Sequence, residues 1–231
     1  MGDFGCAPRT VRPAPKNSGV DPLIPVIDTP RLRLRSIASA DVPAILSLHA
    51  NRHAMRWVGS DPITTPDEAQ AFVDFAASGW RQPIPDLRWA IERCDTPGLI
   101  GTCGFRNWDT TARHAQLGYE LHWKHRGCGY MDEALAELLR WSFTRMELHR
   151  VNALVHPDNM PSRRVLQRHL FHCEGMLRDA GFWHGRHHDL LVFGLLRHEF
   201  VTSAASMTQS VPRAASPAQA PAQAPAQTQT A

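Results

Sequence analysis

Residues 118–134 read GYELHWKHRGCGYMDEA, and this stretch decides the fold class. It begins inside His114–His122, where polar and apolar residues alternate as in a strand. After Gly129, apolar residues recur every three or four positions as far as Met146, the spacing of one helical face. A strand that passes through a short glycine loop into an amphipathic helix predicts an α/β domain.

The flanking sequence supplies the other elements of this domain. We expect strands at 32–36, 87–93, 98–105, 150–155, 171–177 and 190–196, and helices at 42–50, 65–77, 129–146 and 159–169. This order predicts one domain over residues 27–200, with a mixed, mostly antiparallel sheet flanked by helices. The strand, helix, strand run from His114 to Val155 implies one parallel crossover.

The ends of the chain differ from this domain in composition. Residues 1–26 are rich in Pro, Gly and Arg without periodicity, which predicts a flexible N-terminal arm. Residues 201–231 end in a Pro/Ala/Gln-rich repeat that cannot bury a core, so we expect a disordered tail.

Composition argues against several classes of protein. The 231 residues are 43% hydrophobic, and a net charge of +3 without a basic stripe argues against a nucleic-acid partner. The five cysteines form no CxxC pair, so we expect free thiols and a reducing, cytoplasmic location. The histidines of His184–Asp189 fit no zinc spacing, so we expect no metal. We also expect no secretory signal and no membrane partner, since no apolar run could span a bilayer.

The loop from Arg126 to Gly129 is a candidate phosphate site. Glycines let the backbone approach a ligand, and the next helix begins with unpaired N–H groups and the positive end of its dipole. Lys124 and Arg126 add positive charge. The pattern alone is equally consistent with a tight strand-to-helix turn, but it is neither a P-loop nor a dinucleotide fingerprint.

Four stretches, in this order, resemble the GNAT superfamily of N-acetyltransferases, and more closely its ribosomal-protein N-terminal acetyltransferases. They are IDTPRLRLR at 27–35, LGYEL through RGCGYMDEA at 117–134, NMPSRRVLQRHLF at 159–171, and EGMLRD, GRHHD and LLR between 174 and 197. The resemblance covers nearly the whole domain. It implies a GNAT-like fold and direct transfer of an acetyl group from acetyl-coenzyme A (acetyl-CoA) to a primary amine.

The same resemblance implies roles for particular residues. The coenzyme would contact the end of the strand, the loop and one side chain: Leu121, His122, Trp123, Arg126, Gly127, Cys128, Gly129, Tyr130, Met131 and Asn159. Glu120 is the candidate base, acting through water, and Ser162 would lie near the sulfur. Asn159 would serve equally as a helix N-cap, and Ser162 and Glu120 are equally consistent with ordinary surface residues.

The usual thiolate-protonating tyrosine is missing in or after the helix at 159–169. That role would pass to Ser162 or to water. His122 and His156 are rival bases, although each is more often a structural histidine. Trp57 lies in a variable segment that would help to shape the acceptor site.

The acceptor we favour is a protein N-terminal α-amine. Its ordinary pKa of about 7.7–8 lies well below the value of about 10.4 for lysine, so it needs less help from a base. A small amine such as a polyamine, an aminoglycoside or an amino acid is the alternative. A non-catalytic acyl-CoA-binding module is a third hypothesis, motivated by the missing tyrosine. We expect a monomer or a homodimer.

Overall fold

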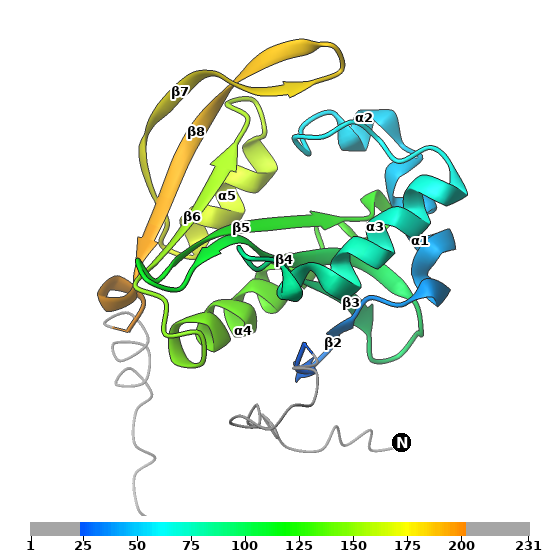
Figure 1. Cartoon of the computed structure of the whole chain (residues 1–231), viewed down its shortest axis with the longest axis horizontal. Coiled ribbons are helices and arrows are strands. Elements are labelled where there is room, and N and C mark those ends of the chain that lie inside the picture. The colour runs from blue at the N-terminus through cyan, green and yellow to red at the C-terminus, as the bar shows by residue number, and fades with distance from the viewer. Residues whose placement is uncertain (1–23, 202–231) are drawn as a thin grey trace, which may run out of the picture.

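An eight-stranded sheet, in the order β1-β2-β3-β4-β5-β6-β8-β7, organises the chain (Figure 1). The computed structural model describes residues 24–201, so most of the predicted arm and tail lies outside the described residues. The strands are β1 (Ile27–Asp28), β2 (Leu32–Ser36), β3 (Leu87–Arg93), β4 (Leu99–Asp109), β5 (His114–Leu121), β6 (Arg150–Val155), β7 (His172–Trp183) and β8 (Arg186–Leu196). The α-helices are α1 (Val42–His49), α2 (Arg52–Met55), α3 (Pro66–Ser78), α4 (Tyr130–Thr144) and α5 (Met160–Arg168).

The α/β class and the mostly antiparallel sheet are confirmed. Strands β5 and β6 pair in parallel through the α4 crossover, and the other neighbouring pairs are antiparallel. The last two strands are longer than predicted, because they continue to a two-residue turn at His184 and Gly185. Both turn residues have positive φ, 52° and 72°, the geometry that matches the twist of a hairpin.

Local sequence explains where the helices begin. Thr65 caps α3 by accepting a hydrogen bond from the Glu68 N–H (3.2 Å), and the Glu68 carboxylate accepts one from the Thr65 N–H (3.1 Å). Pro66 occupies the first helical position, where no N–H is needed. The α4 helix begins differently, directly from Gly129 and without a side-chain cap.

Helices cover both faces of the sheet (Figure 1). The larger core lies against α4 and α5, and the smaller one lies under α1 and α3. Trp89 and Phe105 are fully buried in the larger core. Because both faces are covered, a ligand can reach the middle of the sheet only where strands separate.

Strands β5 and β6 separate in this way. Their parallel register ends at Gln116 and Asn152. Beyond that point β5 continues beside β4 as far as Leu121, while β6 continues beside β8 as far as Val155. The second half of β5 therefore presents an edge without a strand partner, next to the start of α4.

Candidate active site

A cleft with a volume of about 1110 Å³ opens where β5 and β6 diverge. Its walls come from β5, the glycine loop, α5 and the segment between α2 and α3. Nine of the predicted site residues line it: Glu120, Leu121, Arg126, Gly127, Gly129, Tyr130, Met131, Asn159 and Ser162. The fold thus brings most of the candidate residues into one opening.

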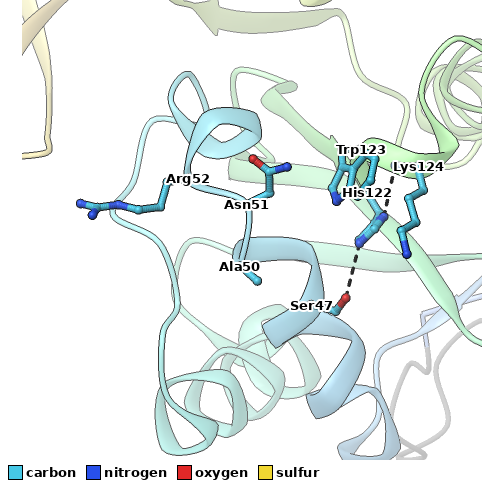
Figure 2. Close-up of a pocket in the computed structure, with 7 residues that line it drawn as sticks. All are labelled: Ser47, Ala50, Asn51, Arg52, His122, Trp123 and Lys124. Carbon is cyan, nitrogen blue, oxygen red and sulfur yellow. Dashed lines mark hydrogen bonds between the residues drawn. The ribbon is translucent and has the colours of Figure 1, made fainter.

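Two predicted coenzyme contacts, His122 and Trp123, lie elsewhere. They line a separate depression of about 450 Å³ (Figure 2), with Ser47, Ala50, Asn51, Arg52 and Lys124. The His122 N–H donates to the Ile100 carbonyl (2.8 Å), so its backbone still belongs to the β4 ladder. Its ring accepts from the Lys124 N–H (3.3 Å) and contacts the Ser47 hydroxyl (3.4 Å). The His122 ring is thus held by neighbouring groups outside the cleft, and the coenzyme contacts of His122 and Trp123 stay predictions.

The backbone of β5 beside the cleft is available to a ligand. Because the His122 N–H bonds to β4, alternation along the strand turns the backbone groups of Tyr119 and Leu121 away from β4. They point to the opening that β6 has left. The Arg126 side chain crosses this end of the cleft, donating from Nε to the Leu121 carbonyl (3.0 Å) and from Nη2 to the Ala54 carbonyl (3.2 Å).

The glycine loop presents free N–H groups. Gly127 and Gly129 have φ angles of 77° and 78°, a left-handed conformation that glycine adopts without strain. Among residues 24–201, the N–H groups of Gly127, Cys128 and Gly129 have no acceptor in the protein. The first turn of α4 adds further unpaired N–H groups. Together they form a cradle suited to a pyrophosphate.

Two arginines neutralise the acidic residues of this first turn. Asp132 accepts two hydrogen bonds of 2.8 Å from Arg168. Glu133 pairs with Arg31 (2.6 Å), which also donates to the Cys128 carbonyl (3.1 Å). Partial burial would raise the pKa of Glu133, but hydrogen bonds from the Thr29 hydroxyl and from Arg31 keep it below its ordinary value. These contacts hold the loop in place, and the two arginines balance the negative charges of Asp132 and Glu133 beside it.

Glu120 is buried at the centre of the cleft wall, 8% exposed. Thr102 Oγ1 donates to its Oε1 (2.9 Å), and Thr102 in turn accepts from Arg88 (2.9 Å). His49 Nε2 lies 3.4 Å from Oε2, and neither atom has another partner in the described chain. Burial alone would raise the pKa of Glu120, but His49, Arg88 and Thr102 outweigh it and hold that pKa below its ordinary value.

A second contact fixes the orientation of the His49 ring. The backbone N–H of Ile63 donates to His49 Nδ1 (3.2 Å). A backbone N–H can only donate, so Nδ1 is the acceptor and the ring proton sits on Nε2, facing Glu120. Sequence reasoning missed His49, which α1 brings to the site from a distant part of the chain.

Tyr119 and Ser162 meet on the other face of β5. The Tyr119 hydroxyl lies 2.8 Å from Ser162 Oγ and 3.2 Å from its carbonyl oxygen. Burial raises the pKa of Tyr119, so its hydroxyl stays protonated. This contact between Ser162 and a tyrosine on β5 was not predicted from the sequence, and the role of Ser162 stays a prediction. Alternation along the strand was the available clue, since it places the side chains of Tyr119 and Glu120 on opposite faces.

Asn159 is an N-cap and also lines the cleft. Its Oδ1 accepts from the Ser162 N–H (3.2 Å), which leaves its amide nitrogen for a ligand. His156 accepts from the Asp158 N–H (3.1 Å) and stacks on Trp57, with 3.9 Å between ring centroids. These contacts hold the His156 ring in place, and Trp57 lines the cleft, where its part in shaping the acceptor site stays a prediction.

The loop after α2 is tied to the β7–β8 hairpin above the cleft. Trp183 Nε1 donates to the Arg56 carbonyl (3.0 Å), and the His184 N–H donates to Asp61 (2.8 Å). The ring of His188 stacks on Trp183 with centroids 3.8 Å apart. Within the described chain, no group of three His, Cys, Asp or Glu side chains could hold a metal ion, and none of the helices is long and apolar enough to cross a membrane.

Comparison with known proteins identifies relatives of this architecture. A family model, Acetyltransferase (GNAT) domain, matches residues 31–172. YoaA of Bacillus subtilis (strain 168), named as an N-acetyltransferase, is 31% identical over 178 residues, which is 76% of this chain and 98% of YoaA. The [ribosomal protein uS5]-alanine N-acetyltransferase of Escherichia coli (strain K12) is 28% identical over 166 residues, covering 66% of this chain and 81% of that one.

Solved structures share the fold. The spermidine N-acetyltransferase from Vibrio cholerae, in complex with CoA and spermine, superimposes with a TM-score of 0.64 at 23% identity. The match covers 74% of this chain and 98% of that one. At this identity the likeness concerns the fold alone.

Proposed function

We propose, from the premise that the chain belongs to the acetyltransferase (GNAT) family, that it acetylates the N-terminal α-amine of a protein. Family membership makes the chain an N-acetyltransferase that uses acetyl-CoA. The observation that carries the choice of acceptor is the buried Glu120 carboxylate, whose low pKa makes it a weak base. A weak base suits an α-amine, with an ordinary pKa of about 7.7–8, better than a lysine side chain near 10.4. A relative named for the alanine of a ribosomal protein supports the same choice.

The cleft fits an extended coenzyme. The unpaired N–H groups from Gly127 to Met131 would hold its pyrophosphate, and the edge of β5 at Tyr119 and Leu121 would run along its pantetheine arm. Asn159 would contact the same arm from α5. When bound, acetyl-CoA supplies the thioester whose carbonyl carbon the amine attacks.

Side chains on the two faces of β5 would move the protons. Glu120 takes a proton from the acceptor amine, directly or through one water, while Thr102 and His49 hold the carboxylate in place. On the opposite face of β5, the Ser162 hydroxyl is hydrogen-bonded to the Tyr119 hydroxyl. From there Ser162 would donate a proton to the sulfur of the departing coenzyme. The amine attacks the thioester directly, so neither Glu120 nor Ser162 has to act as a nucleophile.

A thiol-release assay tests the acceptor. We expect release with peptides that have a free N-terminus, and none with the same peptides blocked at the N-terminus but carrying a free lysine. Turnover confined to spermidine or to an aminoglycoside would refute the N-terminal acceptor. A rise in Tm with acetyl-CoA, but no thiol release across the panel, would instead identify a binding module.

A further inference from the structure

Two arginines lie beside Glu120 in the cleft, and Arg106 has no part in the chemistry above. Arg88 on β3 and Arg106 on β4 both line the cleft. Gly104 pairs with Arg88 on one side and with Gly118 on the other. Because neither glycine has a side chain, the backbone of the sheet beside the arginines is not covered by side chains from these two positions. A Cβ atom at Gly118 would lie 3.4 Å from Arg88 Nη2 and 3.8 Å from Arg106 Nε and Nη2. The two guanidinium groups therefore converge over one spot.

Arg106 has no direct acidic partner in the described chain. Among the residues that the structure describes, its guanidinium group makes no hydrogen bond and no ion pair. Burial, and then repulsion from Arg88, lower the pKa of Arg106, while the negative charges of Asp86 and Glu120 oppose this. Arg88 Nη1 donates to Thr102 (2.9 Å) and lies 4.0 Å from Glu120 Oε1, while Arg88 Nη2 lies next to Gly118. Two cationic groups with unused donors thus face the cleft.

The position of the pair relates it to Glu120. Gly118 precedes Glu120 by two residues, which is about 7 Å along a strand. Phe72 and Phe75 from α3 also line the cleft, and the Phe72 ring centroid lies 5.8 Å from the Arg88 guanidinium carbon. An acceptor whose amine meets Glu120 would place a group several ångströms further on against the arginines.

We propose that Arg88 and Arg106 bind a carboxylate of the acceptor, which rests on the proposed function of the cleft. The preferred substrate is a primary amine with a carboxylate within one or two residues. An Asp or Glu side chain near a peptide N-terminus supplies this chemistry, and so does the carboxylate of a free amino acid. A polyamine lacks it and is repelled by the same pair.

Matched peptides test the pair. We compare kcat/KM for peptides that begin Ala-Glu, Ala-Gln and Ala-Lys, and for free glutamate and spermidine, in the wild type, Arg106→Gln and Arg178→Gln. Arg178 is an exposed arginine on β7, outside the cleft. We expect the wild type to prefer Glu to Gln by about tenfold, the size of one charge-assisted hydrogen bond. Arg106→Gln removes the preference, Arg178→Gln keeps it, and the ratio of peptide to free glutamate assigns the source of the carboxylate.

Equal turnover of the Glu and Gln peptides by the wild type would overturn the proposal, as would an unchanged preference in Arg106→Gln. The Tm shift with acetyl-CoA in each variant shows that the fold and the coenzyme site are intact. If no acceptor is turned over, the proposed function fails separately. The binding of the Ala-Glu peptide, measured by calorimetry, then tests the arginine pair by itself. If Arg88 and Arg106 bind the carboxylate, Arg106→Gln should lose affinity for this peptide; an unchanged affinity would contradict the proposal.

Discussion

The two ends of the cleft differ in the groups that they present to a ligand, which are backbone N–H groups at one end and side chains at the other. At the coenzyme end, residues 127–131 present backbone N–H groups, and side chains only brace the loop. At the acceptor end, Glu120 is one of four side chains in contact, together with His49, Thr102 and Arg88, which come from three other elements. The first end depends on local backbone conformation, and the second depends on the register of distant segments.

This difference determines what a substitution can do. A change of backbone conformation at the loop should weaken coenzyme binding and leave the proton chemistry alone. A change of side chain at Glu120 should do the reverse.

The largest effect is expected for Glu120→Gln. The amide keeps the shape of the side chain but cannot accept a proton from the amine, so kcat should fall by about 100-fold or more. The rise in Tm with acetyl-CoA should persist, because Glu120 does not belong to the loop. Glu174→Gln, which breaks only an exposed pair with Arg150, is the control and should keep full turnover. A loss of less than tenfold in Glu120→Gln would remove it from the mechanism.

The second prediction concerns Gly127→Ala at the coenzyme end. A Cβ at Gly127 meets no atom within 4 Å, so the substitution acts through φ alone, at a cost of about 1–2 kcal/mol. If the loop relaxes to relieve this strain, the KM for acetyl-CoA should rise by about tenfold. Gly185→Ala is a matched control, because that residue also has positive φ and open space but lies at the β7–β8 turn. If both variants lose the same Tm but only Gly127→Ala raises the KM for acetyl-CoA, the result supports a pyrophosphate site at residues 127–131. Equal KM values in the two variants would contradict that site.

The same contrast explains how much the sequence could predict. The glycine loop was predictable because two glycines before an amphipathic helix fix the conformation locally. His49 and Thr102 could not be found, since nothing in the periodicity says which helix or strand faces Glu120. The positions of His122 and Trp123 could not be found either, because the chain leaves the ladder in a 3-10 turn at Trp123–His125, a bend that alternation along a strand does not reveal.

The third prediction concerns the pair on the other face of β5. Tyr119→Phe and Ser162→Ala each remove one hydroxyl of a 2.8 Å contact, and each should lower kcat by up to about tenfold. If the two hydroxyls hold one proton as a unit, the double variant should lose little more than either single variant. A double-mutant cycle on kcat measures this coupling. Multiplicative losses would mean that the residues act separately.

The smallest effect is expected for His49→Asn. Asparagine retains an acceptor for the Ile63 N–H but removes the group that faces Glu120, so the pKa of Glu120 should rise. The acidic limb of the kcat/KM profile should then move to higher pH, while the plateau above it stays nearly unchanged.

The free energy of unfolding of His49→Asn should also depend on pH, because the substitution raises the pKa of Glu120. A carboxylate whose folded pKa is depressed stabilises the protein above its unfolded pKa, about 4.3, and loses that contribution as the pH falls through the folded value. The variant should therefore be less stable than the wild type near pH 7, and the difference should vanish in acid. An acidic limb that stays in place would mean that His49 only fills space, and that Thr102 and Arg88 are enough to hold Glu120 ionised.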